Sequence, residues 1–320
     1  SSTIIQGILL PRPRRFAHAR ALHSITFMQA KDYRDLFLLA AIWGSSFLFM
    51  RLSVAEFGPF ALAEVRLGLS ALMLLAVAAL RGRLGLIWRH VRHISIVGIF
   101  ASGLPFVCFS IAAQSVPAGV MAVINAITPL FGALIAWLWL REQLSPARIL
   151  GLVVGFSGIL VLVWSDLSFG PGTMGWGVVA CLGAAVCYGI AASYTTRYLK
   201  GVDPIALAAG SITSAALFAL PTAIVMWPEA PVSAGSWAAA SALALLCTGV
   251  AYIIFYGLVD RVGATRSITV TFLVPLFGIL WGALILHEPV TLRMLAGTSI
   301  VLLGTLLATG FIGSRASAAA

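Results

Sequence analysis

The chain has 320 residues, of which 61% are hydrophobic and only 9% charged, and its mean hydropathy is +1.04. Soluble domains carry about 25% charged residues, so this composition excludes an ordinary water-soluble fold. The net charge of +10 does not indicate nucleic-acid binding, because the Lys and Arg residues are scattered between long apolar runs and form no basic face.

Residues 1–35 form a basic N-terminal extension that precedes the first apolar run. Its first 27 residues contain four arginines and no acidic residue. The short apolar stretch at 4–10 comes before the arginines, which reverses the order of a secretory signal. We expect residues 1–27 to be a dispensable extension with the native start at Met28, and an organellar transit peptide is the alternative.

Ten apolar segments follow, each long enough for a bilayer-crossing helix of about 20 residues. Turn-forming pairs such as Ser145-Pro146, Asp203-Pro204 and Glu288-Pro289 separate them. The runs do not alternate polar with apolar side chains, which excludes a β-barrel. We therefore predict an all-α membrane protein with ten transmembrane helices, at 36–55, 59–80, 94–113, 117–140, 145–164, 176–198, 204–226, 237–258, 264–286 and 291–312.

The loop charges predict that both chain ends lie in the cytoplasm. With the N-terminus inside, the outer loops hold only Arg51 and Arg293. Cytoplasmic loops of membrane proteins carry an excess of Lys and Arg, so this bias sets the orientation. The inner loops and termini hold the other thirteen loop charges: Lys31, Arg34, Arg81, Arg83, Arg89, Arg92, Arg141, Arg148, Arg197, Lys200, Arg261, Arg266 and Arg315.

The chain contains an internal repeat. At a shift of 146 residues, eight of the fourteen positions from 129 to 142 are identical, including Pro129 on Pro275 and Glu142 on Glu288. At a shift of 145, Gly44 falls on Gly189. We therefore divide the chain into two five-helix repeats, 36–164 and 176–311, with a linker at 165–175 and a C-terminal tail at 312–320.

An odd number of helices per repeat requires the second copy to enter the membrane with opposite polarity. The loop charges agree, because the loop at 81–92 holds four arginines whereas its counterpart at 227–237 has no Lys or Arg. Inverted repeats are typical of secondary transporters, which bind their substrate near the membrane midplane between the copies. The sequence thus predicts two inverted repeats that alternate access to one site.

Several motifs resemble those of the drug/metabolite transporter superfamily, EamA-like family. The segment Leu39-Ala-Ala-Ile-Trp-Gly-Ser-Ser-Phe47 resembles its opening motif, and Ala63-Glu-Val-Arg-Leu67 resembles its second-span arginine. Thr248-Gly-Val-Ala-Tyr252, Gly263-Ala-Thr265 and the run from Pro275 to Glu288 resemble its second repeat. One departure is His287, where a glycine usually precedes the glutamate. The resemblance implies a carrier for amino acids, other metabolites or drugs, often directed outward and without ATP hydrolysis.

Glu64 and Arg66 are the charged residues placed plainly inside a predicted span. A charge at mid-membrane is costly, so such residues usually face a cavity or a partner. The two side chains point about 200° apart on a helix and do not face each other. The second copy has Ala209 and Ser211 at these positions, so an electrostatic role would belong to one half. Packing at the outer end of the helix remains the alternative for both residues.

Other candidate cavity residues lie at helix breaks or are aromatic. Pro129 and Pro275 each sit midway along a predicted span, where a proline removes a backbone hydrogen bond and kinks the helix. Each kink could free carbonyls near the midplane or be purely structural. The remaining candidates are polar residues near these prolines and aromatic residues inside spans, which could line an apolar cavity or fill the core: Trp43, Asn125, Thr128, Tyr188, Tyr252 and Thr271.

No catalytic, metal-ligand or phosphate-loop pattern is present, so we predict no enzyme activity, cofactor or metal. The favoured function is a secondary transporter that exports a small organic metabolite across a bacterial cytoplasmic membrane. The alternatives are a channel-like facilitator and a membrane-embedded lipid-modifying enzyme. The expected partners are the lipid bilayer and the substrate. The sequence does not decide whether a proton or another ion is coupled to transport, or whether the protein is a monomer or a homodimer.

Overall fold

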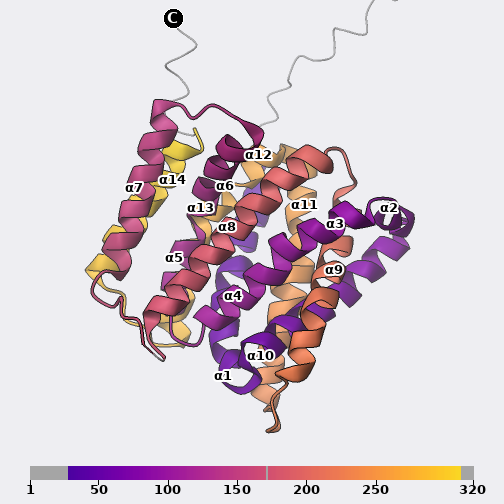
Figure 1. The fold of residues 1–320 in the computed structure, drawn as a ribbon, viewed down its shortest axis with the longest axis horizontal. Helices are drawn as coiled ribbons and strands as arrows, with labels where there is room; N and C mark the ends of the chain where they lie inside the picture. The colour runs from indigo at the N-terminus through magenta and orange to yellow at the C-terminus, as the bar shows by residue number, and fades with distance from the viewer. Residues whose placement is uncertain (1–27, 171, 311–320) are drawn as a thin grey trace, which may run out of the picture.

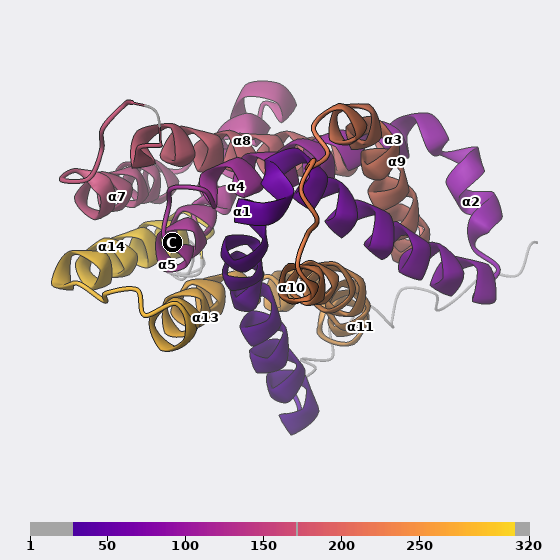
Figure 2. The ribbon, with the colours of Figure 1, turned by 90° about the horizontal axis from the view of Figure 1, so that it is seen from below.

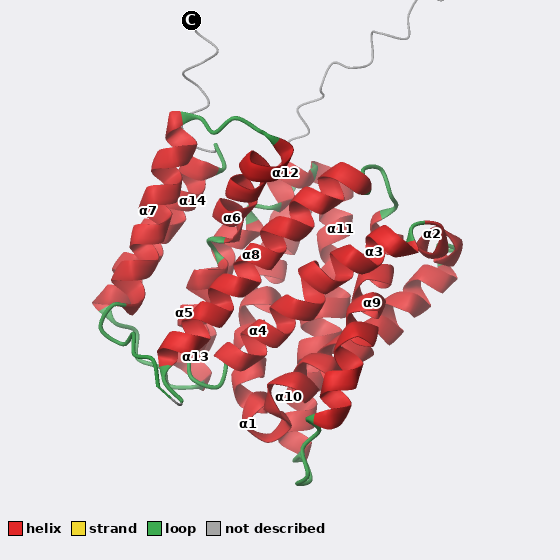
Figure 3. Cartoon of the chain, in the orientation of Figure 1, coloured by secondary structure: helices red, strands yellow, loops and turns green. Residues whose placement is uncertain are grey.

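A computed structural model describes residues 28–170 and 172–310, and within these ranges the chain forms helices and no strand (Figure 3). The predicted extension before Met28 and the predicted tail at 312–320 lie outside the described residues. The α-helices are α1 Ala30–Leu80, α2 Leu84–Arg89, α3 Val91–Gly98, α4 Leu104–Ala112, α5 Ala118–Asn125, α6 Thr128–Ile135, α7 Pro146–Val163, α8 Met174–Tyr198, α9 Pro204–Val225, α10 Ala234–Ala244, α11 Ala251–Val262, α12 Ala264–Ser267, α13 Val270–Ile285 and α14 Leu292–Ala308.

Three π-helical segments extend or join these helices. Ile99–Gly103 joins α3 to α4, Ala136–Leu140 extends α6, and Leu245–Val250 joins α10 to α11. π-Helical turns inside helices are rare and occur frequently at functional sites. The last of the three contains Cys247, which lines the cavity described below.

The first two predicted spans are the two halves of α1. Gly58 breaks the helix with a φ of 69°, a left-handed conformation that glycine adopts without a Cβ penalty. Pro59 follows and starts the second half with its φ already suited to a helix. The chain therefore reverses within a few residues, and the two halves diverge from this bend (Figure 2).

Seven continuous helical segments are long and apolar enough to cross a membrane, and two shorter apolar helices, α13 and α14, follow them. Each range predicted as a span overlaps one of these helices, and α1 begins at Ala30, inside the predicted extension. The number of crossings and their orientation stay predictions. What the structure confirms is an all-helical chain with several apolar, membrane-length segments.

The first half of α1 lies between α13 on one side and α10 with α11 on the other, and its second half runs beside α9 (Figure 2). At one edge of the molecule, α7 and α14 form a separate pair (Figure 1). Glycines bring these two backbones together, because a Cβ at Gly151 would lie 2.6 Å from the Gly304 carbonyl oxygen and one at Gly297 3.1 Å from that of Gly158. The small residues of α7 and α14 are thus used for packing within the molecule.

Two further glycines mark close crossings that repeat in the two halves of the chain. A Cβ on Gly44 in α1 would lie 2.6 Å from the Cβ of Phe277 in α13. A Cβ on Gly189 in α8 would lie 2.9 Å from the carbonyl carbon of Phe131 in α6. Gly44 and Gly189 are equivalent at a shift of 145, and Phe131 and Phe277 at a shift of 146. The first apolar helix of each half, α1 or α8, therefore crosses a helix of the other half at close range.

The helix breaks differ from those that the prolines predict. In the first half the break lies at residues 126–127, between α5 and α6, and Pro129 sits in the first turn of α6. In the second half the break lies at 268–269, whereas Pro275 is inside the continuous helix α13. Pro275 therefore lies within a continuous helix and Pro129 directly after a break, so the two prolines occupy different local settings.

Candidate functional site

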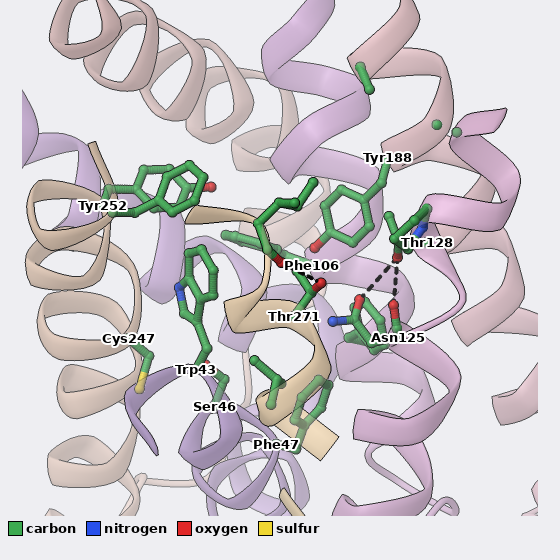
Figure 4. Close-up of a pocket in the computed structure, with 18 of the residues that line it drawn as sticks. Trp43, Ser46, Phe47, Phe106, Asn125, Thr128, Tyr188, Cys247, Tyr252 and Thr271 are labelled. Carbon is green, nitrogen blue, oxygen red and sulfur yellow. Dashed lines mark hydrogen bonds between the residues drawn. The ribbon is translucent and has the colours of Figure 1, made fainter. Parts of the chain in front are cut away.

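A cavity of about 530 Å³ lies between the two halves of the chain (Figure 4). This volume is within the range of about 300–1,000 Å³ that is typical of small-molecule sites. Its walls come from α1, α4, α5, α6, α8, α11 and α13 and from two segments between helices. The lining residues are Trp43, Ser46, Phe47, Met50, Arg66, Phe106, Phe109, Asn125, Thr128, Pro129, Gly132, Tyr188, Gly189, Ala192, Cys247, Tyr252, Phe255, Tyr256, Ile268, Thr271 and Val274.

The structure brings most of the predicted site residues together around this cavity. Those that line it are Trp43, Arg66, Asn125, Thr128, Pro129, Tyr188, Tyr252 and Thr271. Glu64 and Pro275 do not line it. Glu64 lies two residues before Arg66, so the helix turns its side chain away, and Pro275 is buried beside the lining residue Val274. Whether the eight residues bind a substrate stays a prediction.

Arg66 is held in place by neutral groups. Its side chain is buried, its Nε donates a hydrogen bond of 3.0 Å to Thr248 Oγ1, and its Nη1 lies 3.8 Å from Met50 Sδ. The guanidinium carbon lies 3.5 Å from the centroid of the Phe106 ring, a cation–π arrangement. Arg66 therefore faces the cavity, and the alternative of packing at the end of its helix does not describe it.

The breaks in the helices place polar groups at the cavity wall. Because α5 ends at Asn125, the carbonyl of that residue has no helical partner, and the Thr128 hydroxyl donates a hydrogen bond of 2.7 Å to it (Figure 4). In the second half, the Thr271 hydroxyl donates a bond of 2.7 Å to the carbonyl of Ile268 in the same way. The Asn125 amide nitrogen has no protein acceptor among the described residues and remains available to a ligand.

Aromatic side chains form most of the remaining wall. Trp43 packs against Phe255 with 5.3 Å between ring centroids, and Phe109 lies 6.4 Å from Tyr188. The sequence analysis missed Phe106, Phe255 and several other aromatic lining residues. Their helical spacing from Tyr252 is the signal that could have identified Phe255 and Tyr256, but Phe106 carries no comparable mark. Among the described residues, no cluster of His, Cys, Asp or Glu could hold a metal ion.

Glu288 follows the end of α13 that lies away from the lining residues Ile268 and Thr271, and it contacts Arg51 and the first turn of α5. We call this cluster the Glu288 end. The Glu288 carboxylate accepts hydrogen bonds from the backbone N–H groups of Ala118 at 2.9 Å and Gly119 at 3.4 Å. Arg51 Nε lies 3.6 Å from Glu288 Oε1, and Arg51 Nη1 donates a bond of 3.0 Å to the Ala113 carbonyl. These contacts tie the loop after α13 to α1 and α5.

Two lining residues are exposed, Ala192 in α8 and Ile268 before α13, and Ile268 precedes the end of α13 opposite to Glu288. We call the surface at these two residues the Ala192 mouth. The residues that line the cavity on α8 and α13 lie toward this end of their helices, whereas those on α6 lie in the first five residues of that helix.

Comparison with known proteins supplies the family. The EamA-like transporter family matches this chain twice, at residues 36–164 and again at 175–310. The chain belongs to the EamA-like transporter family. The two matches coincide closely with the two repeats that the sequence predicts, and the cavity is lined by residues of both matched segments.

Relatives with this family's architecture come from bacteria and archaea. The chain is 30% identical to "Uncharacterized transporter YvbV" of Bacillus subtilis, over 84% of this chain and 90% of that protein. It is 24% identical to an "Uncharacterized transporter" of Archaeoglobus fulgidus, over 86% and 97% of the two chains. It is also 28% identical to "Uncharacterized inner membrane transporter YedA" of Escherichia coli, over 55% and 56%.

A crystal structure of another protein has the same fold, with a TM-score of 0.62 over 89% of this chain and 98% of that one, at 19% identity. The family, its relatives and the apolar helices together establish a multi-pass membrane protein of the bacterial inner membrane. They also establish membrane transport as its general function.

Proposed function

We propose that this EamA-family protein is a secondary carrier that exports a small organic metabolite by alternating access between two inverted repeats. The observation that carries the proposal is the cavity itself, which is enclosed by helices of both family matches and lies between them. Secondary transporters built from inverted repeats place their substrate site at this kind of interface. The carrier binds the metabolite there and exposes it to the two sides in turn.

The mirrored helix crossings support the relation between the copies. Gly44 meets Phe277 and Gly189 meets Phe131, so exchanging the two copies exchanges one crossing for the other. The turns that follow α6 and α13 also correspond, because Arg141 and His287 both adopt a left-handed φ, 57° and 54°. A left-handed backbone is the conformation that glycine favours, and it fits the glycine that the family usually has at the position of His287.

The two ends of the cavity then represent the two sides of the membrane. Arg51 lies in the first half of α1 and Glu288 in the loop after α13, and the charge bias assigns both to the outer side. The Ala192 mouth lies at the opposite end of α13 from Glu288. We assign the structure to an inward-facing state of the proposed cycle, because the exposed lining residues lie at the end that the loop charges predict to be cytoplasmic. Export requires the Glu288 end to open and the Ala192 mouth to close around the loaded site.

Cysteine accessibility tests the pathway without knowledge of the substrate. In a background lacking the four native cysteines, we expect Asn125→Cys and Thr271→Cys to react with a membrane-impermeant thiol reagent in inside-out vesicles. A variant that retains only Cys181, which is fully buried, serves as the unreactive control. If both sites remain unreactive from either side in protein that still transports, this cavity is not the pathway.

Transport is tested by a resistance screen and by counterflow. Cells that overproduce the carrier should tolerate toxic analogues of its substrate, and the compound found in this way is loaded into proteoliposomes with the purified protein. A carrier shows saturation and counterflow of labelled compound, whereas a channel-like facilitator shows neither. Linear, non-saturating flux would contradict alternating access.

A further inference from the structure

We propose that the cavity selects organic monocarboxylates with an apolar, aromatic-sized body, and that Arg66 binds their carboxylate. The inference rests on the proposed carrier function for its biological meaning, but it concerns binding and can be tested apart from transport. The reason for it is a mismatch between the charge of Arg66 and the groups around it.

Arg66 is a buried cation without an anionic partner. Its side chain is 7% exposed, and its contacts are the Thr248 hydroxyl, the Met50 sulfur and the Phe106 ring, all of which are neutral. No Asp or Glu lines the cavity, and Arg66 forms no ion pair within residues 28–170 and 172–310. Buried charges in proteins are normally paired, because an isolated one is costly in a medium of low polarity.

The guanidinium also keeps donors free on the cavity side. Arginine has five N–H donors in a planar fork, and the contacts above involve only Nε and Nη1. No described residue accepts a hydrogen bond from Nη2. Because Nη2 is not among the buried polar atoms that lack a partner, it is accessible from the cavity that Arg66 lines. Two donors of such a fork match the two oxygens of a carboxylate.

The rest of the cavity defines what the carboxylate is attached to. Eight aromatic rings line the walls, and the polar side chains besides Arg66 are neutral: Ser46, Asn125, Thr128, Thr271, Cys247 and the phenols of Tyr188, Tyr252 and Tyr256. A single cation matches a single negative charge, so a phosphate dianion would leave charge unbalanced. An ammonium group would find no carboxylate to pair with among the lining residues, and the Arg66 cation in the same cavity would repel it. The site therefore favours a monoanion over an amino acid or a cationic drug.

Three probes with the same phenyl group test this directly. At neutral pH 3-phenylpropionate is an anion, phenylalanine a zwitterion and 2-phenylethylamine a cation. Binding to the purified protein is followed by quenching of tryptophan fluorescence, since Trp43 lines the cavity. We expect 3-phenylpropionate to bind roughly tenfold or more tightly than the other two, the factor that one charged hydrogen-bonded contact supplies.

Substitutions assign the preference to Arg66. Arg66→Gln should remove the advantage of 3-phenylpropionate, and Arg66→Lys should keep part of it, because lysine retains the charge but not the fork. Arg89→Gln, which removes an exposed arginine from the end of α2 that does not line the cavity, is the matched control and should bind as the parent does. Thermal stability in detergent verifies that each variant is folded.

The outcomes separate this inference from the proposed function. Binding of 3-phenylpropionate that depends on Arg66 but occurs without counterflow would support the carboxylate site and count against the carrier. Saturable counterflow of a cation or an amino acid, unaffected by Arg66→Gln, would support the carrier and count against the carboxylate site. The inference is overturned if the parent protein binds none of the three probes or prefers the amine, and this comparison holds even if every Arg66 variant fails to fold.

Discussion

Glu288 lies 3.6 Å from Arg51 and at the same time accepts a hydrogen bond from the backbone of Ala118 at 2.9 Å. Three parts of the chain that are far apart in sequence therefore meet at one carboxylate. A negative charge at the start of a helix is stabilised by the unpaired N–H groups there and by the helix dipole. Gly282 permits this approach, because a Cβ at that position would lie 2.5 Å from Glu288 Oε2.

Neutralising this carboxylate should loosen the Glu288 end. Glu288→Gln keeps the shape of the side chain but removes the negative charge, which pairs with Arg51 and interacts favourably with the N-terminus of α5. The contact should lose about 1 kcal/mol of stability, or roughly fivefold in a two-state equilibrium. We expect a cysteine at Asn125 to react correspondingly faster with an impermeant reagent added outside. The measurement is the labelling rate in intact cells of the cysteine-free background.

Glu229→Gln is the matched control, because Glu229 is exposed and forms no ion pair within the described residues. It removes the same charge from a nearby loop without touching the contact. An equal rise in labelling for both variants would show that the effect is one of surface charge and not of the Glu288 contact.

Glu142 is the counterpart of Glu288 in the first repeat, and its surroundings differ. Its carboxylate is half exposed and lies 4.0 Å from Arg148. A second cavity beside it is lined by Trp139, Leu140, Arg141, Thr196 and Arg197. At a shift of 145 the counterpart of Arg51 is Thr196, and Arg197 is the next residue. Inverted repeats that exchange conformations would bring Glu142 and Arg197 into the contact that Glu288 and Arg51 form here.

Glu142→Gln should therefore act in the opposite direction from Glu288→Gln. It leaves the contacts of the present state almost unchanged and removes the charge that would stabilise the outward-facing state, so the inward-facing population should rise. We expect slower labelling of the Asn125 cysteine from outside and unchanged or faster labelling in inside-out vesicles. A change of the same sign in both variants would contradict the exchange of gates between the repeats.

The repeat and the family could be predicted from the sequence because they depend on rare residues. Proline, glycine and glutamate matches such as Pro129 on Pro275 are informative in a chain rich in leucine, and the two family matches follow the same division. Arg66 could be predicted as a cavity residue because a charge within an apolar span is costly unless it faces a cavity or a partner. Eight of the ten selected residues line one cavity for the same reason: polar and aromatic residues inside spans are unusual.

Other features depend on three-dimensional packing that the sequence does not reveal. Phe106 lines the cavity because it lies under the Arg66 guanidinium, a contact between helices that no local pattern marks. The second break lies at 268–269 and not at Pro275, because a proline can remain in a helix when neighbouring groups satisfy the freed carbonyl. The role of Glu288 could not be read from its position in a loop.

The predicted orientation can be tested with fusions to a reporter that is active only outside the cytoplasm. Arginine-rich loops stay inside, so a fusion after Arg89, within the loop at 81–92, should be silent. A fusion after Pro231, in a loop that lacks Lys and Arg, should be active. Activity after Arg89 would reverse the orientation and would exchange the sides that we assign to the Glu288 end and the Ala192 mouth.

The mirrored crossings at Gly44 and Gly189 should be equally intolerant of an added methyl group. In Gly44→Ala the new Cβ would lie 2.9 Å from the Gly278 nitrogen, and in Gly189→Ala it would lie 3.0 Å from the Phe131 carbonyl oxygen. Contacts this short with backbone require the helices to separate, and overpacking of this kind costs about 1–3 kcal/mol. We expect both variants to lose thermal stability in detergent and to transport more slowly.

Gly183→Ala is the control on the same helix as Gly189, because its Cβ would meet only Cys108 Sγ at 4.0 Å. Alanine favours a helix more than glycine does, so this variant should be at least as stable as the parent. The double variant Gly44→Ala with Gly189→Ala distinguishes a shared hinge from two independent contacts. If the crossings move together as the repeats exchange, the double variant should lose little more transport than either single variant, whereas fully additive losses would show that the two crossings act separately.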